Sequence, residues 1–432
     1  MGKTIFRNGW LADVEQRRLV RGELLVEDKR ITAIAPRITC ETAEEIDLAD
    51  AVLAPGFIDL HTHLREPGYE HKETIASGAQ AAAAGGFTTI ACMPNTRPAL
   101  DTAARVAWVK EQAAATSIVK VLPIGAISVE QTGRELTDFA ALQASGAVAF
   151  SDDGRGVMSS KMMLLALQAA QALAVPIMAH EEDAELAGRG SINAGRISQQ
   201  LGDEGIPAAS EFIMLARDLY LAELTGGHLH VCHVSSAESV HLIRAAKARG
   251  IQVTAEVTPH HLHLTEAVVP ALLGQAKVNP PLRSEADREA LITGMLDGTI
   301  DIIATDHAPH AAHEKDVPLS QAAFGFSGLE VAFAVAQAAL VQPGLLTLAE
   351  LLPALTCRPA AILGLPQGRL AVGTPADLVV LAPQKRWYVN PDNLRSQGKN
   401  TPYLNQELIG QAVLTMVDGS IVFRRDRDAS DA

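Results

Sequence analysis

The sequence predicts an α/β protein in which a central (β/α)8 TIM barrel carries a small β-sandwich domain assembled from both termini. Two observations predict this. The middle of the chain alternates apolar runs of strand length with Ala/Leu/Glu-rich stretches of helical length, whereas both ends contain strand and hairpin patterns. With 432 residues, 48% of them hydrophobic, the chain can form one large and one small domain. We expect the β-sandwich domain at 1–54 plus 365–432 and the catalytic barrel at 55–364.

The first 54 residues have the pattern of short strands. Residues 22–34 contain two β-type runs around a charged turn, which is typical of a hairpin. At the other end, residues 376–381 form an apolar strand-like run, and residues 413–423 predict a second hairpin with Asp418 and Gly419 at its turn. Two strand-rich ends around a different middle indicate one β domain built from both.

The middle of the chain contains eight strand–helix units in about 310 residues. The expected strands lie near 57–63, 87–93, 119–126, 147–152, 175–180, 228–233, 252–257 and 301–306, and the expected helices at 72–85, 101–115, 160–173, 208–224, 236–249, 285–297 and 329–341. Eight units favour the (β/α)8 barrel over an open doubly wound sheet, and no glycine-rich dinucleotide motif follows the first strand. The open sheet is the alternative.

Two connections, 181–207 and 311–327, are too long to be simple turns. Loops of this length inside a compact domain are usually functional or disordered. Both follow strands on the side where barrel enzymes place their active sites. Whether 311–327 closes over a substrate is open at this stage.

Composition excludes several functional classes. The formal net charge of −14, without a basic cluster, argues against nucleic acid as a partner. The four cysteines lack paired spacing, the first residues lack the apolar core of a signal peptide, and no apolar stretch is long enough to span a bilayer. We therefore expect a cytoplasmic enzyme with a small-molecule substrate and no membrane or nucleic-acid partner.

Ligand-type residues stand at the ends of five of the expected strands. In His61-Thr-His63, strand alternation puts both imidazoles on the same side, which forms half a metal site. The alternative for this pair alone is one core and one surface histidine. The other strand ends carry Asp152-Asp153, His180, His233 and Asp306. Because strand ends converge at one rim of a barrel, these histidines and carboxylates predict a divalent metal site, with zinc first.

Seven motifs resemble those of dihydroorotases in the amidohydrolase superfamily, especially the larger bacterial type I enzymes. They occur in order along the whole chain: His61-Thr-His63-Leu-Arg65-Glu-Pro-Gly, Cys92-Met-Pro-Asn95, Ser151-Asp152-Asp153-Gly, Ala179-His180-Glu, Cys232-His233-Val-Ser, Val278-Asn279-Pro-Pro-Leu-Arg and Thr305-Asp306-His-Ala-Pro-His310. The resemblance implies a cyclic amide hydrolase of pyrimidine biosynthesis that interconverts dihydroorotate and N-carbamoyl-L-aspartate.

The resemblance also implies two Zn²⁺ ions per chain, bridged by Asp153 and a hydroxide, with no carboxylated lysine. The implied ligands are His61, His63 and Asp306 for one ion, and His180 and His233 for the other. Asp306 would also be the catalytic acid–base, and its alternative role is ligation alone. Alternation does not separate Asp152 from Asp153, so Asp153 is chosen from the motif, and Asp152 is expected to be a supporting or turn residue.

Dihydroorotate carries a carboxylate outside its ring, which calls for a cation and hydrogen-bond donors. The substrate-binding residues that the resemblance implies are His63, Arg65, Asn95, Asn279, His310, Phe324 and Gly325. By contrast, His228 and His230 alternate away from His233, so we expect them to face helices or solvent.

Two further hypotheses stay open at the sequence level. One is another cyclic amidase, a hydantoinase or an allantoinase. The other is an inactive dihydroorotase-like scaffold for aspartate carbamoyltransferase, although every expected ligand is present. A homodimer is expected, and association with aspartate carbamoyltransferase is a further possibility that the resemblance raises.

Overall fold

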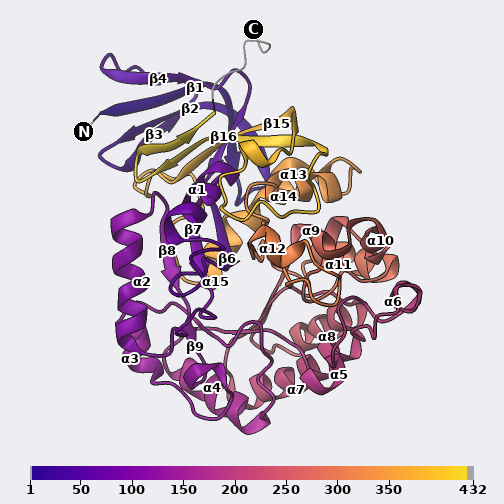
Figure 1. Ribbon diagram of the computed structural model, residues 1–432. Coiled ribbons are helices and arrows are strands. Elements are labelled where there is room, and N and C mark those ends of the chain that lie inside the picture. The colour runs from indigo at the N-terminus through magenta and orange to yellow at the C-terminus, as the bar shows by residue number, and fades with distance from the viewer. Residues whose placement is uncertain (1, 426–432) are drawn as a thin grey trace.

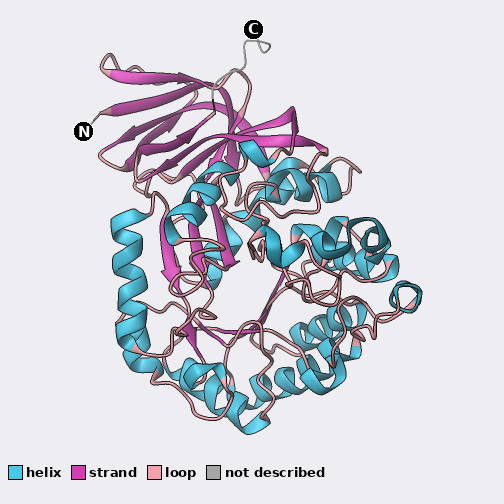
Figure 2. Cartoon of the chain, in the orientation of Figure 1, coloured by secondary structure: helices cyan, strands magenta, loops and turns pink. Residues whose placement is uncertain are grey.

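The computed structural model describes residues 2–425, and its centre is a set of parallel strands surrounded by helices (Figures 1 and 2). One parallel sheet contains β6 (Phe57–Thr62), β7 (Phe87–Cys92) and β8 (Lys120–Pro123). A second parallel sheet contains β9 (Gly125–Ala126), β10 (Phe150–Ser151), β11 (Ile177–Ala179), β12 (Leu229–Val231), β13 (Val253–Val257) and β14 (Ile302–Ile303).

Hydrogen bonds join these two sheets into a closed ring. Only Ile124 separates β8 from β9, and its N–H donates to the carbonyl of Cys92 at 3.0 Å. On the other side, Thr62 forms a parallel bridge with His307, and the N–H of His63 donates to the carbonyl of His307 at 2.8 Å. The strands therefore close into the predicted (β/α)8 barrel, and the open-sheet alternative is wrong.

The predicted helices are present, with ends that shift by a few residues. They are α1 (Ile75–Gly85), α2 (Ala103–Thr116), α4 (Ser160–Ala172), α7 (Ala209–Thr225), α8 (Ala237–Ala248), α11 (Glu285–Asp297) and α13 (Ala332–Ala336), the last continuing as a π-helical turn over Gln337–Val341. Hydroxyl side chains cap several N-termini, as Thr74 does for α1 and Ser284 for α11.

Several short helices were not predicted because fewer than eight residues give little periodicity. They are α3 (Phe139–Ala144), α5 (Ala184–Ala187), α6 (Arg196–Leu201), α9 (Pro259–His263), α10 (Val269–Leu272), α12 (Ala312–Lys315), α14 (Leu348–Leu351) and α15 (Cys357–Ile362). The two long connections are thus partly helical, since α5 and α6 lie in the first and α12 in the second.

Both ends of the chain contribute to one eight-stranded sheet beside the barrel (Figure 1). Its strands are β1 (Lys3–Asp13), β2 (Arg18–Glu27), β3 (Arg30–Ala35), β4 (Ala43–Asp47), β5 (Val52–Pro55), β15 (Leu378–Tyr388), β16 (Glu407–Val417) and β17 (Ser420–Arg424). β5 pairs with β15 and joins the two halves. Both predicted hairpins, β2–β3 and β16–β17, are present.

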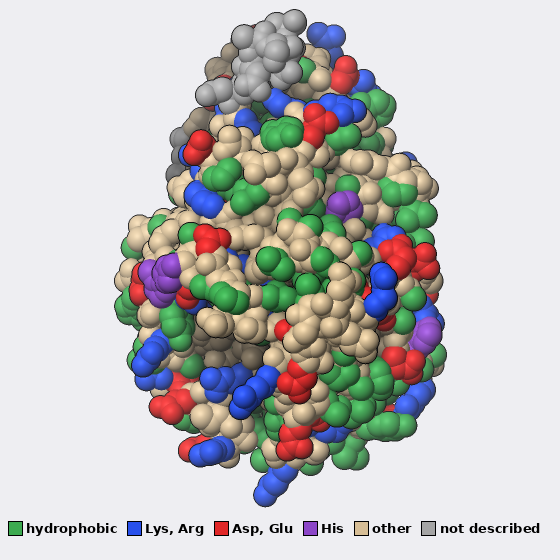
Figure 3. Space-filling model, turned by 45° about the vertical axis from the view of Figure 1, so that its right-hand side comes forward, with side chains coloured by type: hydrophobic (Ala, Val, Ile, Leu, Met, Phe, Trp, Pro, Cys, Tyr) green, Lys and Arg blue, Asp and Glu red, His purple; other side chains and the backbone are tan. Residues whose placement is uncertain are grey.

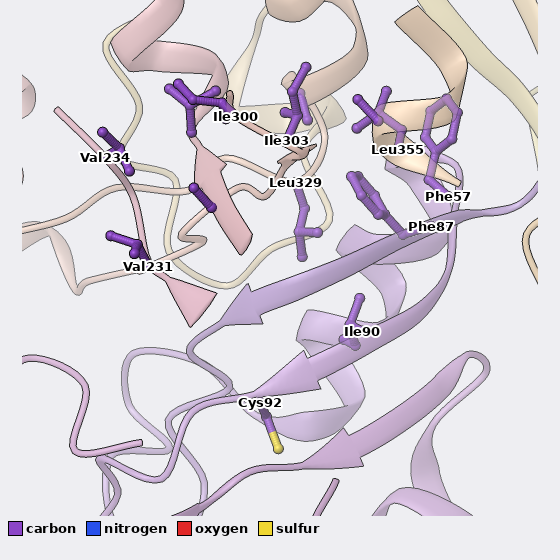
Figure 4. Close-up of a cluster of buried hydrophobic side chains, with 14 of the residues drawn as sticks. Phe57, Phe87, Ile90, Cys92, Val231, Val234, Ile300, Ile303, Leu329 and Leu355 are labelled. Atoms are coloured by element: carbon purple, nitrogen blue, oxygen red, sulfur yellow. The ribbon is translucent and has the colours of Figure 1, made fainter. Parts of the chain in front are cut away.

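The strands of the barrel are held by a continuous apolar core (Figure 4). Phe57 at the start of β6 packs edge-on against Phe87 of β7, with ring centroids 5.5 Å apart, and both rings are fully buried. Leu329 and Leu355 from late in the chain pack in the same cluster. Apolar burial thus fixes the first strand, at whose other end the polar residues of the site lie.

Charged side chains of both signs lie on the surface of the molecule (Figure 3). On the face drawn in Figure 3, acidic and basic side chains are interspersed and no extended basic area is visible. Among the residues that the structure describes, no helix is both long and apolar enough to cross a membrane.

Candidate metal centre and active site

Five strand ends bring the predicted metal ligands together at one rim of the barrel. His61 and His63 follow from β6, Asp153 follows β10, His180 follows β11, His233 follows β12, and Asp306 follows β14. All six side chains are buried, none of these residues being more than 6% exposed. Residues that are up to 245 positions apart in sequence therefore share one desolvated site.

The carboxylate of Asp153 lies between the four histidines. Its Oδ1 is 3.3 Å from His61 Nε2, 3.5 Å from His233 Nε2 and 3.7 Å from His180 Nδ1. Its Oδ2 is 3.4 Å from His63 Nε2. One carboxylate thus reaches imidazoles from three different strands, which is the position that a bridging ligand needs.

Asp152 points elsewhere. Its Oδ1 accepts hydrogen bonds from the backbone N–H groups of Ile127 and Ser128, at 2.9 and 3.1 Å, and the Ser128 hydroxyl donates to its Oδ2. Asp152 therefore links the end of β10 to the segment after β9. Of the two adjacent aspartates, only Asp153 faces the histidines.

The remaining ligand-type atoms complete two overlapping groups. Asp306 Oδ1 is 2.9 Å from His63 Nε2 and 3.6 Å from His61 Nε2. His180 Nδ1 and His233 Nε2 are 2.9 Å apart. His61 Nε2 and Asp153 Oδ1 are buried without a hydrogen-bond partner. Clustered imidazole and carboxylate atoms, some of them unsatisfied, fit a divalent cation such as zinc, so these residues form a candidate metal centre.

The electrostatics favour a cation at this centre. Burial would lower the pKa of His61, but the carboxylates of Asp153 and Glu256 outweigh it and raise that pKa well above its ordinary value. Burial would raise the pKa of Asp153, but His61, His233 and His63 hold it well below its usual range. Burial would also raise the pKa of Glu256, but His61 and His230 hold it below its usual range. Asp153 and Glu256 are therefore both ionised, and a bound metal would supply the positive charge that protons otherwise provide.

Three residues of the site have left-handed backbone conformations. The φ angles are 63° at Arg65, 31° at His233 and 47° at Asp306. Such conformations are unfavourable for residues with a Cβ, and they persist where the surrounding structure determines them, often at functional sites. The backbone thus turns sharply at the points where three strands deliver their side chains to the rim.

A cavity of about 150 Å³ lies beside the metal centre and contains most of the predicted substrate-binding residues. Its lining is His63, Arg65, Asn95, Asp153, Gly154, His180, His233, Asn279, Asp306, Ala308, Phe324 and Gly325. Asn95 Oδ1 is 2.9 Å from His63 Nδ1, and Asn279 Oδ1 is buried without a partner. The cavity therefore places ligand-type atoms, one guanidinium and an unsatisfied amide oxygen around the same small space.

His310 lies behind Arg65 and is not part of this lining. Its Nε2 is 2.7 Å from the Phe324 carbonyl and 3.2 Å from Arg65 Nη2, while Lys72 Nζ approaches Nδ1 at 3.4 Å. Burial, with Arg65 and Lys72 nearby, lowers the pKa of His310 to about 2. Because a carbonyl can only accept, the 2.7 Å contact with Phe324 puts a ring proton on Nε2, so Arg65 packs beside this nitrogen without donating to it. His310 Nδ1 faces both Lys72 and the carboxylate of Glu314, which is also 3.4 Å away.

Comparison with known proteins agrees with these features. Residues 50–239 match the family model described as dihydro-orotase-like, and residues 325–423 match that of the amidohydrolase family. The chain is 50% identical over 409 residues to a dihydroorotase of Geobacillus sp. (strain WCH70), covering 94% of this chain and 96% of that protein. It is 47% identical over 426 residues to a dihydroorotase of Syntrophus aciditrophicus (strain SB), covering 98% and 100%.

The chain belongs to the dihydroorotase family. Dihydroorotases are cyclic amide hydrolases, and the buried His/Asp cluster of this chain is a metal site typical of them. Among solved structures, an L-hydantoinase (dihydropyrimidinase) from Arthrobacter aurescens is similar, with a TM-score of 0.89, 25% identity, and coverage of 99% of this chain and 97% of the other. A D-hydantoinase from a Thermus species has a TM-score of 0.83 at 25% identity, covering 98% and 95%.

This member of the dihydroorotase family offers no lysine to the metal centre. Among the described residues that line the cavity there is none, and the fourth barrel position carries Asp153. A carboxylated lysine is therefore not available to bridge two ions at this position.

Three carboxylates that sequence reasoning did not assign also support the site, and two of them, Asp59 and Glu256, are fully buried. Asp59 accepts from the backbone N–H of His61 at 3.0 Å and from both the N–H and the hydroxyl of Thr305, so it joins β6 to β14. Glu182 Oε1 is 3.8 Å from His180 Nε2, and Glu256 contacts His61. The sequence signal that could have identified Asp59 and Glu256 as site residues is an acidic residue inside an apolar run of strand length.

The expectation for His230 is wrong. Its side chain is fully buried and its Nε2 is 3.0 Å from Glu256 Oε2, so it faces neither helices nor solvent. His228 is half-buried and shares the hydroxyl of Thr254 with His230. Simple alternation failed because β12 ends at Val231 and the backbone turns at His233, where φ is 31°.

Buried neutral histidines around the site predict acid sensitivity. Burial and the neighbouring His233 lower the pKa of His261 from 6.5 to about 4, and its ring nitrogens bond Thr258 Oγ1 and the carbonyl of Pro280. The unfolded chain therefore binds a proton between pH 6.5 and 4 that the folded chain does not, so the free energy of unfolding falls as the pH falls through this range. We expect His261→Gln to reduce this fall by about 3 kcal/mol at most.

Urea unfolding at several pH values from 7 to 4 would measure this effect. The exposed His241 offers a matched control, because His241→Gln removes a histidine that lies on the surface of α8. Equal pH slopes for His261→Gln and the unsubstituted protein would contradict the prediction.

Proposed function

We propose that this protein interconverts dihydroorotate and N-carbamoyl-L-aspartate with a pair of zinc ions at the metal centre. The observation that carries the proposal is a single cavity lined by His63, His180, His233, Asp153, Asp306 and Arg65. Ring-amide hydrolysis needs an activated water, stabilisation of the developing oxyanion and a proton for the departing nitrogen. A substrate with an additional carboxylate also needs a cation, which Arg65 provides.

We assign His61, His63 and Asp306 to one ion, His180 and His233 to the other, and Asp153 to the bridge. The distances of 3.3–3.7 Å from Asp153 to all four histidines support this assignment. When bound, such ions make a hydroxide available near neutral pH and polarise the substrate carbonyl. The protein itself contributes an array of fixed ligands in a site that excludes bulk water.

Asp306 is the proposed acid–base residue. It lines the cavity, and burial, which alone would raise its pKa, is outweighed by His61 and His63, which lower that pKa. An ionised carboxylate can accept the proton of the attacking water and then donate it to the ring nitrogen as the amide bond breaks. In the reverse direction the same group removes the proton from the attacking nitrogen.

Arg65 and Asn95 are the proposed partners of the carboxylate outside the ring. Arg65 Nε donates to the carbonyl of Pro309 at 3.2 Å, which orients the guanidinium beside the cavity. His310 is the further proposed partner of this carboxylate; it packs beside Arg65, and its Nε2–H donates to the Phe324 carbonyl. A guanidinium can make two parallel hydrogen bonds to a carboxylate.

Asn279, Phe324 and Gly325 would contact the ring. The unsatisfied Oδ1 of Asn279 can accept from a ring N–H. The backbone N–H of Gly325 already donates to the Lys277 carbonyl, so Gly325 contributes mainly shape. Its φ is 111°, and a Cβ at this position would lie 2.5 Å from the Cβ of Ala308. Only glycine fits here without moving the wall of the cavity.

We also infer the remaining features of the protein from the sequence and the described residues. The domains are placed at 1–54 plus 365–432, as a β-sandwich, and at 55–364. A cytoplasmic location is supported by four free cysteines. A homodimer, with possible association with aspartate carbamoyltransferase, is the assembly that the family resemblance favours.

Hydantoinase activity is a second candidate, because hydantoinases are among the similar solved structures. Ring-opening assays with dihydroorotate, hydantoin and allantoin would separate the candidates. We expect turnover of dihydroorotate, its loss after treatment with a chelator, and its return with Zn²⁺. Turnover of hydantoin alone would favour a hydantoinase, and absence of activity with less than one zinc per chain would favour a scaffold.

Asp306→Asn should keep the shape of the side chain and remove its acid–base function. Loss of general acid–base catalysis typically reduces a rate by about 10²- to 10⁴-fold. We therefore expect kcat to fall by at least about 100-fold while His61 and His63 still hold zinc. Metal analysis and kcat, beside the control Asp316→Asn on an exposed residue, would measure this. Appreciable residual activity in a zinc-loaded variant would remove the acid–base role.

Arg65→Met should weaken the handling of the substrate carboxylate without changing metal content. A hydrogen bond to a charged group contributes about 1.5–3 kcal/mol, so kcat/KM should fall by about 10- to 100-fold. Steady-state kinetics in both directions would test this, with Arg134→Met as a control at an exposed arginine. An unchanged KM and kcat would place the carboxylate elsewhere.

A further inference from the structure

Glu256 is a carboxylate in the interior of the barrel that the proposed reaction does not use. It belongs to β13, which lies between β12 and β14, and its side chain is fully buried. An ionised carboxylate in such a place is costly unless its oxygens accept hydrogen bonds. Its partners therefore indicate why the barrel holds it.

Both oxygens of Glu256 contact groups next to the metal centre. Oε1 is 2.6 Å from His61 Nδ1 and accepts from the backbone N–H of His233 at 3.2 Å. Oε2 is 3.0 Å from His230 Nε2. One carboxylate thus contacts a ligand-type histidine from β6, the backbone of another after β12, and a third histidine that reaches no other carboxylate in the described structure.

These contacts determine which nitrogen of His61 carries a proton. An ionised carboxylate only accepts, so His61 Nδ1 must donate to Glu256 Oε1. In a neutral ring the lone pair is then on Nε2, the atom that is buried without a partner and faces Asp153 and Asp306. A metal ligand needs its lone pair at this nitrogen, and a carboxylate on the other nitrogen makes it a stronger ligand.

On its other side, Glu256 is held by a series of hydrogen bonds that all run in the same direction. His230 Nε2–H donates to Glu256 Oε2, so its Nδ1 must accept from the Thr254 hydroxyl, 2.8 Å away. Thr254 Oγ1 in turn accepts from His228 Nε2–H, also at 2.8 Å. Every donor among these contacts has one acceptor, and His230 has partners on both of its ring nitrogens.

We propose that Glu256 is a positioning residue that fixes the tautomer and orientation of His61 for metal binding, and that His230 and Thr254 hold Glu256 in place. The inference rests on the proposed metal centre and adds a function for residues outside the ligand set. The carboxylate also adds a negative charge directly behind the ligand, where it favours a cation on the other side of the ring.

Two substitutions of Glu256 separate the effect of its hydrogen bond to His61 from the effect of its negative charge. In Glu256→Gln the amide oxygen can still accept from His61 Nδ1–H, but the negative charge is lost. In Glu256→Ala both are lost, and His61 is free to rotate or to change tautomer. Residues that support metal ligands in this way typically contribute about 10- to 100-fold to metal affinity. We expect the alanine variant at or beyond this range and the glutamine variant between it and the unsubstituted protein.

The measurement is the dissociation constant for Zn²⁺ of the full chain, obtained by competition with a chromophoric chelator. Circular dichroism and thermal unfolding of the chelator-treated proteins report the fold independently of metal. Glu330→Gln is the control, because it makes the same substitution at a half-buried glutamate, which accepts from the backbone N–H groups of Arg395 and Ser396 and does not contact the metal centre.

Weaker Zn²⁺ binding by both Glu256 variants, with the control unchanged, would support the proposal. Zinc affinity within about twofold of the unsubstituted protein, even with a lowered thermal midpoint, would overturn it, because the role would then be structural only. If the alanine variant does not fold, the glutamine variant decides by the same criterion. An unsubstituted protein that binds zinc but does not turn over dihydroorotate would reject the proposed substrate alone, whereas one that binds no zinc would reject both proposals.

Discussion

The structure depends on keeping several ionisable groups together in a site from which water is largely excluded. Four histidines and two aspartates meet at the rim, each at most 6% exposed. Such burial is unfavourable for a single charge, and it becomes acceptable here because carboxylates and imidazoles alternate in space. Asp153 between the four histidines is the centre of this arrangement, and a divalent cation is the partner that would balance it best.

Groups behind the ligands make this arrangement rigid. Asp59 links β6 to the end of β14 by hydrogen bonds next to the site. Glu256, on β13, orients His61. These carboxylates have no access to the cavity, yet they determine where His61 points and which of its nitrogens can bind a metal. Rigid support of this kind keeps ligands in place without a cost of reorganisation at each turnover.

The barrel fold is formed by the strands, whereas the proposed substrate contacts come from the connections that follow them. The barrel is shared with hydantoinases at 25% identity, so the strands alone do not distinguish one cyclic amide from another. The substrate contacts that we propose lie in the connections after the strands, at Arg65, Asn279 and the Phe324–Gly325 segment. Lys315 stabilises that segment, because its buried ammonium donates to the carbonyls of Lys277, Ala323 and Gly325.

The sequence by itself determined the alternation of strands and helices, the two terminal hairpins, the strand ends that carry ligands and, through its motifs, the family. These are local patterns, set by side-chain periodicity, turn residues and short motifs. Only the tertiary structure decided that Asp153 and not Asp152 faces the histidines, that His310 packs behind Arg65 against the Phe324 carbonyl, and that His230 and Glu256 lie beneath His61. Those outcomes depend on how strands twist and turn at the rim, where alternation ends and long-range packing determines the direction of each side chain.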